Sequence, residues 1–209
     1  MKQLKMTILL ITTLLLTTAC GITQELDESL TVAKELETTI KEQRSAMKEL
    51  LSLVERIFPS FEKDLEIEPE VGLFQQEEGT LYKNFTAREE MLTELHSGQK
   101  TLVKLQKEVQ RISDKNAVDV DHDKLNLISS SLQIILNNYD SLTMYLETGF
   151  EQEKELYNNL PVDNLNDQGS VINRTYGSVT MVGEESISNM NYTLNLVKTY
   201  QKEVSNQKK

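Results

Sequence analysis

Apolar residues recur at alternating steps of three and four along most of the chain. The resulting stripes run over residues 26–57, 81–112, 125–160 and 165–204. Steps of three and four place side chains on one face of an α-helix. The pattern therefore predicts four amphipathic helices, each about 45–60 Å long at 1.5 Å per residue.

Turn-forming residues separate these stripes. Pro59 ends the first stripe. The segment that begins there, "PSFEKDLEIEPEVG", predicts a connection with one helical turn. "SDKNAVDVDHD" separates the second stripe from the third, and Pro161 ends the third. Short connections indicate antiparallel neighbours, and a period near 3.5 indicates left-handed coiled-coil packing. We expect residues 26–209 to form one all-α domain, an elongated antiparallel bundle of three to four long helices.

The composition agrees with long helices and narrows the range of partners. The 209 residues include only 8 Gly and 3 Pro, too few for the frequent turns of an all-β fold. There are 33 acidic and 22 basic residues, a net charge of −11; without Lys2 and Lys5 it is −13. So acidic a surface repels nucleic acid and anionic lipid headgroups.

Residues 1–19 have the organisation of a secretory signal peptide. Lys2 and Lys5 precede the apolar run "MTILLITTLLLTT", and Ala19 precedes Cys20, the single cysteine of the chain. "LTTAC" resembles the lipobox of bacterial lipoproteins, although Thr17 stands where Leu is commonest. The resemblance implies cleavage before Cys20 and a diacylglyceryl group on its thiol, with residues 20–25 as a short tether. The alternative is an ordinary secreted protein with an incidental cysteine.

No pattern in the chain indicates catalysis, a cofactor or a metal. "DVDHD" at 119–123 lacks the Gly and the bidentate Glu of a calcium loop, since Lys124 and Ser130 stand there. We expect Asp121 or Asp123 to cap the third helix instead. His96 has no second metal ligand at a suitable spacing, so we expect it to be a solvated or half-buried helix residue. We therefore expect that the protein is not an enzyme.

Three polar residues, Arg88, Gln99 and Glu153, fall where the stripes call for apolar side chains. We hypothesise that Arg88 and Glu153 pair across the second and third helices, because a buried ion pair can specify register. A turn near residue 117 would place Arg88 opposite about residue 147, more than a turn from Glu153. The alternative is that both side chains snorkel outward from the edge of the seam.

Tyrosines are concentrated in the C-terminal half, which holds six of the seven. Tyr139, Tyr176 and Tyr200 lie on the stripes, so we expect them in the core. Tyr145, Tyr157 and Tyr192 lie off the strict stripes. We expect these three to be the better candidates for exposed contact with a glycan or a protein partner.

The sequence resembles the YkyA-type cell-wall-binding lipoproteins of Gram-positive bacteria. The resemblance lies in the lipobox, the long helical region, "AREE" with Arg88, "EKELYNNL" closing the third helix and "INRTY" opening the fourth. It implies a helical lipoprotein on the outer face of the cell membrane that contacts the wall. No catalytic residues come with it.

These observations predict a lipid-anchored, extracytoplasmic, non-catalytic module that interacts with peptidoglycan or with an envelope protein. Direct binding to polyanionic teichoic acid is disfavoured by the negative charge of the chain. The alternative is a structural or regulatory partner of a membrane protein complex that does not bind the wall directly.

Overall fold

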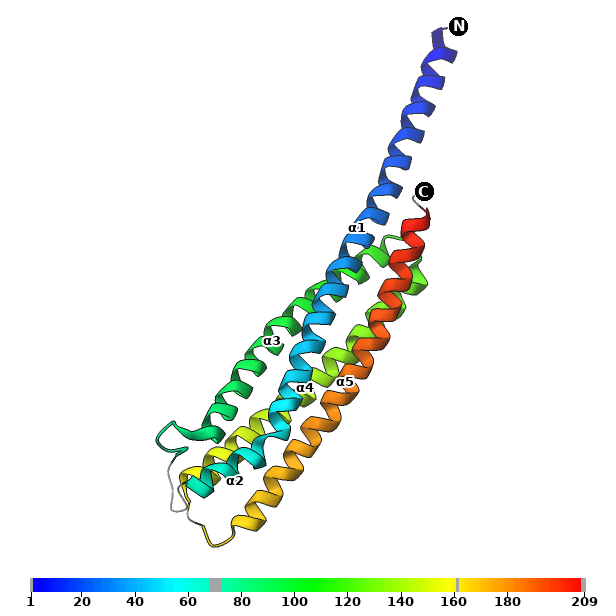
Figure 1. Cartoon of the computed structure of the whole chain (residues 1–209). Coiled ribbons are helices and arrows are strands. Elements are labelled where there is room, and N and C mark those ends of the chain that lie inside the picture. Colours follow the sequence, from blue (N-terminus) through cyan, green and yellow to red (C-terminus); the bar gives the residue numbers. More distant parts are fainter. Residues whose placement is uncertain (1, 68–72, 161, 208–209) are drawn as a thin grey trace.

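Four long antiparallel helices and one short helix form an elongated bundle (Figure 1). The computed structural model describes residues 2–67, 73–160 and 162–207, with side chains from Gln24 onward. The helices are α1 (Lys2–Glu55), α2 (Ile57–Ile67), α3 (Gly79–Asp114), α4 (His122–Asn158) and α5 (Leu165–Gln207). The predicted all-α antiparallel bundle is confirmed, with four long helices and not three.

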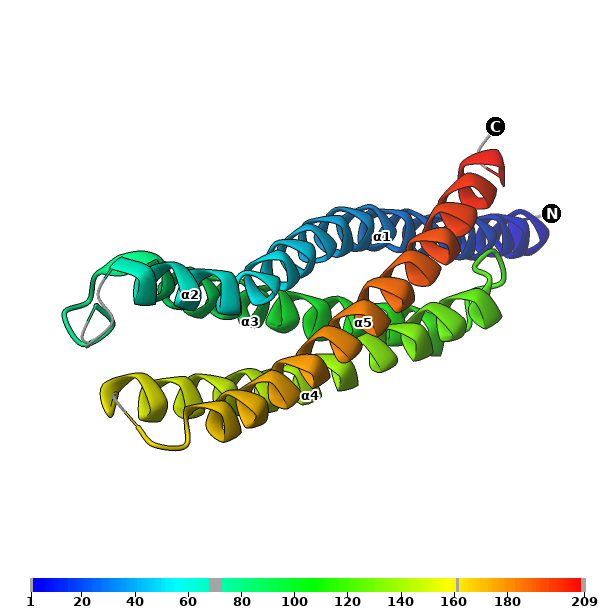
Figure 2. The ribbon, with the colours of Figure 1, turned by 60° about the horizontal axis from the view of Figure 1, so that its bottom comes forward.

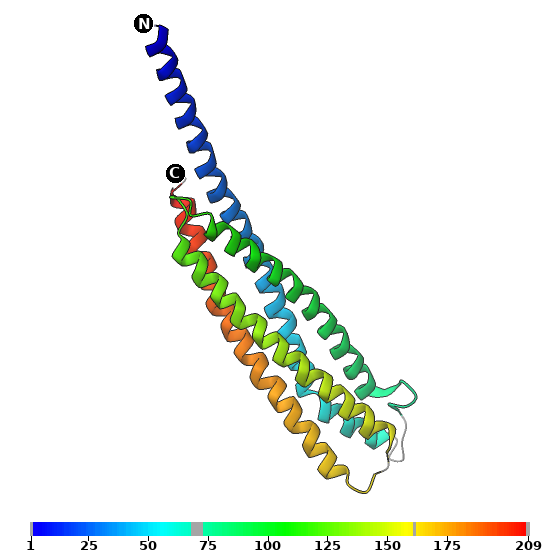
Figure 3. The same ribbon diagram turned by 180° about the vertical axis from the view of Figure 1, so that it is seen from behind.

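The long helices form a closed ring around one core. α1 and α4 each contact both α3 and α5, and Figure 3 shows α4 between its two neighbours. The stripes read from the sequence face inward; Ile40, Leu95, Leu132 and Val197, one from each long helix, are completely buried. Burying a side chain of this kind stabilises the fold by roughly 1.5–3 kcal/mol.

The connection after the first stripe differs from the prediction. Where one helical turn was expected, α2 is a helix of 11 residues, and α1 ends at Glu55, before Pro59. Pro59 is the third residue of α2, where a backbone N–H has no partner within the helix, so proline is tolerated. α2 contacts α3 and α1, and Figure 2 shows it running beside α3 and apart from α5.

Asp64 of α2 caps the N-terminus of α3. Its Oδ1 and Oδ2 accept hydrogen bonds from the backbone N–H groups of Thr80 (2.9 Å) and Leu81 (2.8 Å). Gly79, the first residue of α3, has a φ of +84°, and a Cβ there would lie 2.5 Å from Asp64 Oδ2. Only glycine meets both conditions. This capping contact holds α2 against the bundle.

The turn between α3 and α4 confirms the capping prediction. Asp121 is the N-cap of α4 and accepts a hydrogen bond from Lys124 N at 3.0 Å, while Asp123 lies in the first helical turn. His122 Nε2 lies 2.8 Å from the carbonyl oxygen of Ala117. Among the described residues, no group of three or more His, Cys, Asp or Glu side chains could hold a metal ion.

The N-terminal part of α1 projects beyond the other helices (Figure 1). Cys20 and the predicted signal peptide lie outside the residues whose side chains are described. The first buried side chain is Leu26, one residue after the predicted tether. Within the described part of the chain, no helix combines the length and apolar character needed to cross a bilayer.

Candidate interaction surfaces

Arg88 of α3 and Glu153 of α4 form a bidentate ion pair inside the bundle. Arg88 Nη1 donates to Glu153 Oε1 at 2.6 Å, and Nη2 donates to Oε2 at 2.8 Å. Both side chains are 0% exposed. The structure therefore brings the two residues together, and the alternative that both snorkel outward does not hold.

Further hydrogen bonds connect this pair to the remaining long helices. Arg88 Nε donates to Asn84 Oδ1 (2.8 Å), and Nη1 donates to the Tyr176 hydroxyl of α5 (2.5 Å). Asn84 Nδ2 in turn donates to the carbonyl oxygen of Leu53, near the end of α1 (2.8 Å). One buried cluster thus connects all four long helices.

The Arg88 side chain keeps its charge in this environment. Burial lowers the pKa of the guanidinium, but the hydrogen bonds and charge of Glu153 outweigh burial and hold the pKa above its ordinary value. Burial raises the pKa of the Tyr176 hydroxyl, and the negative charge of Glu153 adds to this effect. The cluster joins the four long helices at one level, and the Arg88 and Glu153 side chains are completely buried.

The alignment of α3 and α4 explains how the pair forms despite the expected offset. Hydrogen bonds join Gln99 to Asp140, His96 to Thr143 and Ser113 to Asn126, and the residue numbers of each pair average 119.5. The centre of the hairpin thus lies later than the predicted turn near residue 117, because the loop continues to the cap at Asp121. The long side chains of Arg88 and Glu153 span the small remaining offset.

The tyrosines predicted for the core are buried. Tyr139 donates to Gln43 Oε1 (2.7 Å) and Tyr200 donates to Ser29 Oγ (2.7 Å), so each hydroxyl has a partner on α1. Burial raises the pKa of the Tyr139 hydroxyl. These uncharged contacts supplement the Arg88 cluster at other levels of the bundle.

Tyr157, predicted to be exposed, is 2% exposed, so that expectation was wrong. The ring centroids of Phe61 and Phe74 lie 5.1 and 5.4 Å from that of Tyr157. The sequence prediction treated this part of the chain as a connection, whereas α2 carries Phe61 across the end of α4. The covering of Tyr157 follows from this tertiary placement.

An open groove of about 440 Å³ lies between α2 and α5 at the end of the bundle far from Cys20. We call it the distal groove. Phe58, Phe61 and Leu65 of α2 form an apolar wall. The facing wall, on the first turns of α5, carries uncharged polar side chains and one glycine; these residues are Asn166, Gly169, Ser170 and Asn173. A hypothetical Cβ on Gly169 would have no atom within 4 Å, so this wall is open.

A second surface lies on the outer side of α4 and α5. Its exposed members are Leu127 (44%), Ile134 (48%), Met181 (63%) and Tyr192 (52%), and half-buried Tyr145 and Leu196 adjoin them. We call these six residues the α4–α5 patch. Two of the three tyrosines predicted for contact, Tyr145 and Tyr192, belong to it. Their role in binding stays a prediction.

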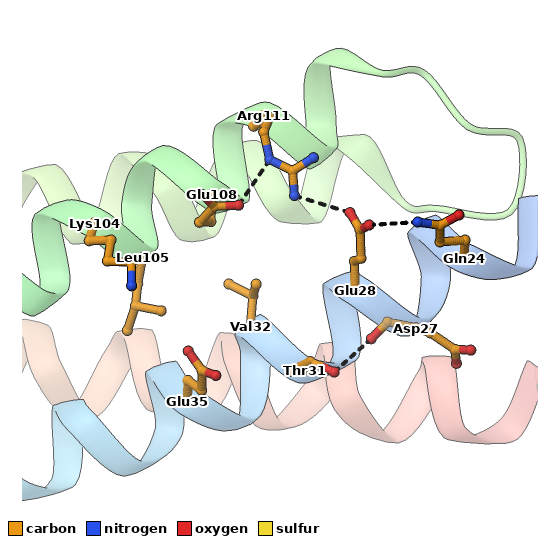
Figure 4. A pocket seen from close by; sticks show the side chains of 10 residues that line it. All are labelled: Gln24, Asp27, Glu28, Thr31, Val32, Glu35, Lys104, Leu105, Glu108 and Arg111. Carbon is orange, nitrogen blue, oxygen red and sulfur yellow. Dashed lines mark hydrogen bonds and ion pairs between the residues drawn. The ribbon is translucent and has the colours of Figure 1, made fainter. Parts of the chain in front are cut away.

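A third surface, between α1 and α3 near the end of the bundle from which α1 projects, is charged. A groove of about 740 Å³ between α1 and α3 is lined by four acidic and two basic side chains, which are Asp27, Glu28, Glu35, Glu108, Lys104 and Arg111. Figure 4 shows Arg111 reaching both Glu108 of its own helix and Glu28 of α1, at 2.9 and 3.0 Å. Several of its charged groups are therefore occupied with one another.

Comparison with known proteins gives no relative for the chain. No protein family, no curated protein and no solved structure gives a significant match. The three surfaces are therefore interpreted from their geometry and chemistry alone.

Proposed function

We propose that this chain is a lipid-anchored, non-catalytic interaction module of the extracytoplasmic face, which binds an uncharged component of the cell envelope in the distal groove. The observation that supports the proposal most directly is the groove itself. Apolar and aromatic side chains form one wall, and amide and hydroxyl groups form the other. Sites of this mixed character bind ligands that present an apolar face and a hydrogen-bonding edge.

The length of the bundle gives this groove a definite place relative to the proposed anchor on Cys20. Tyr200 contacts Ser29, close to the start of the packed bundle, whereas Leu165 lines the distal groove. At 1.5 Å per residue, these two levels of α5 are about 50 Å apart. Two acyl chains anchor a protein stably. An anchored chain standing upright would present its groove well away from the membrane, toward the wall.

The chemistry of the groove favours the neutral glycan strand of peptidoglycan over teichoic acid. A sugar ring has C–H faces that pack on aromatic side chains and hydroxyl groups that bond to amides such as Asn166 and Asn173. Glu62 lies at the groove, and the chain as a whole carries a net charge of −11, so a polyanion is repelled. A neutral segment of an envelope protein fits the same chemistry.

A pair of glycine substitutions tests the groove. Gly169→Leu fills it, and Gly177→Leu is the matched control, because a Cβ on either glycine meets no atom within 4 Å and Gly177 does not line the groove. Full-length protein in mild detergent is applied to purified wall, with and without teichoic acid and at varied salt. We expect the wild type and Gly177→Leu to be retained and Gly169→Leu to be lost. Equal retention of all three would exclude the groove as the site.

No retention of the wild type under any condition would exclude direct wall binding. Capture of one envelope protein by crosslinking in intact cells would then support the alternative function, a structural or regulatory partner of a membrane protein complex. That capture should depend on an open groove, and hence fail with Gly169→Leu, if the groove is the contact.

The proposed anchor is tested separately. Cells supplied with labelled palmitate should label the wild-type chain, and Cys20→Ala should abolish the label and release the chain from the membrane fraction. Membrane retention without label would contradict a lipid anchor at Cys20.

A further inference from the structure

Four of the six residues of the α4–α5 patch, Leu127, Ile134, Tyr192 and Leu196, lie in parts of α4 and α5 that have no charged residues. Residues 125–139 of α4 and 186–197 of α5 contain no acidic or basic side chain, although 26% of the whole chain is charged. Large exposed apolar residues are also concentrated on these two helices. Six of the eight in the described part of the chain lie there: Leu127, Ile134, Met144, Val171, Met181 and Tyr192.

The two uncharged stretches lie side by side. A hydrogen bond between Ser131 and Thr193 marks where the helices touch. Leu127 and Ile134 lie four residues before and three after Ser131, and Leu196 lies three after Thr193. Residues at these separations are neighbours on a helix surface, so the three apolar side chains flank one contact. Tyr192, four residues before Leu196, extends the surface outward on α5.

We propose that a second copy of this chain docks on the α4–α5 patch, related to the first by a two-fold axis. The charge distribution supports this occupant. Two copies with a net charge of −11 each repel one another, and like charges set directly opposite are strongly unfavourable. Around Leu127, Ile134, Tyr192 and Leu196, the two uncharged stretches bring no charged side chain to the contact from either copy. A cationic partner would instead be attracted to the acidic surfaces elsewhere on the bundle.

The polar groups around the patch are also self-complementary. The exposed ones are amides and hydroxyls, among them Ser130, Asn137, Ser188 and Asn195. A carboxamide or hydroxyl both donates and accepts hydrogen bonds, so such groups can pair with the same groups of an identical copy. In a two-fold interface each surface must match itself, and this surface can do so.

The size of the patch sets the expected strength of the dimer. Stretches of 15 and 12 residues on two adjacent helices, each about 10 Å wide, offer roughly 400 Å² per copy. Stable complexes bury about 800 Å² per partner, so the dimer should be weak and reversible. Confinement on a membrane would favour it by raising the local concentration.

Sedimentation equilibrium of the full chain in density-matched non-ionic detergent tests the dimer. We expect the mass to rise from that of one chain toward that of two between low micromolar and several hundred micromolar concentrations. Ile134→Glu and Tyr192→Glu should each weaken dimerisation about tenfold or more, because each places an acid opposite its own copy. Val118→Glu adds the same charge at a 93% exposed position away from the patch and should have no effect. Circular dichroism establishes that each variant is folded.

A crosslinking experiment examines the same contact without an added charge. In the Cys20→Ser background, Ile134→Cys should form a disulfide with itself under mild oxidation, because a two-fold axis through the patch brings equivalent residues together. Val118→Cys should crosslink only at the rate of random collision. A wild type that stays monomeric throughout would overturn the proposal, as would equal behaviour of the patch and Val118 variants. A neutral protein of different sequence would then be the occupant to seek.

Discussion

Two arginines of α3 form ion pairs with glutamates of neighbouring helices in opposite environments. Arg88 meets Glu153 of α4 in the distal half of the bundle, and both side chains are 0% exposed. Arg111 meets Glu28 of α1 near the other end, at 3.0 Å, with the side chains 46% and 31% exposed. Both pairs join neighbouring helices at hydrogen-bonding distance. The Arg88 pair is bidentate and buried, whereas the Arg111 pair has one contact and is exposed to water.

Burial changes what an ion pair does for the fold. Removing one partner of a buried pair leaves an uncompensated charge in the core and costs roughly 3–5 kcal/mol, whereas an exposed pair contributes about 0–1 kcal/mol. The Arg88 cluster also engages Asn84 and Tyr176, so it joins α3, α4 and α5 at one level of the bundle. The Arg111 pair lies at the surface of the charged groove between α1 and α3.

The largest expected effect comes from Arg88→Met, which keeps much of the apolar stem and removes the charge. Glu153 would then be left buried without its cation, and we expect a loss of about 3–5 kcal/mol in the free energy of unfolding, measured by urea denaturation. A loss below about 1 kcal/mol would show that the buried pair matters no more than a surface pair.

The double variant Arg88→Met/Glu153→Leu sharpens this result. Replacing both charges with apolar groups removes the unpaired carboxylate, so much of the lost stability should return. The difference between the double variant and the sum of the single variants gives the coupling energy of the pair. The same cycle at Arg111 and Glu28 should give a coupling energy of less than about 1 kcal/mol.

Gly149→Ala tests the packing around the buried cluster. A Cβ at this position would lie 2.7 Å from Cζ and 2.8 Å from the hydroxyl oxygen of Tyr176. The ring must shift and weaken its contact with Arg88, so we expect a net destabilisation of about 1–2 kcal/mol after the better helix propensity of alanine is included.

Gly177→Ala, on α5, is the control for that substitution. Its Cβ would meet no atom within 4 Å, so only the propensity gain remains, and the variant should be more stable by up to about 1 kcal/mol. Changes of the same sign in the two variants would contradict the close contact between Gly149 and Tyr176.

Periodicity predicted the long helices because their burial depends on residues three and four apart, which are visible in the sequence. It also singled out Arg88 and Glu153, since polar side chains interrupted otherwise apolar stripes. Their alignment was less predictable. The centre of the α3–α4 hairpin depends on where the loop ends and Asp121 caps α4. If the start of α4 is predicted a few residues too early or too late, every predicted pair of opposing residues on α3 and α4 is shifted.

The features that were missed depend on contacts distant in sequence. Tyr157 looked exposed because α2, with Phe61, lies almost 100 residues earlier in the chain. Asp64 resembles any surface acid locally, and its capping role exists only because Gly79 turns the chain back toward it. Nothing in the local sequence identifies the carboxylate that caps the next helix.

Asp64 differs from both ion pairs. Its carboxylate is buried, like that of Glu153, but it accepts hydrogen bonds from backbone N–H groups and not from an arginine. Asp64→Ala removes the cap of α3 and should cost about 1–2 kcal/mol. Glu66→Ala, at an exposed position of the same helix, is the control and should change stability by less than about 0.5 kcal/mol. Thermal unfolding followed by circular dichroism compares the two, and equal losses would argue against the cap.

The smallest expected effect is that of Glu28→Gln, at the exposed pair. Hydrogen bonds from Arg111 and Gln24 hold the pKa of Glu28 below its ordinary value of 4.5. A carboxylate with a lowered folded-state pKa stabilises the protein above its unfolded-state pKa, and this contribution is lost as the pH falls through the folded-state value. Glu28→Gln should therefore cost less than about 1 kcal/mol at neutral pH and nothing in strong acid. High salt should also remove the stability difference between Glu28→Gln and the wild type, because screening acts on exposed charges. The stability loss caused by Arg88→Met should persist in high salt. Urea unfolding of both variants at low and high salt makes this comparison directly, and a salt-sensitive Arg88→Met penalty would mean that water reaches the buried cluster.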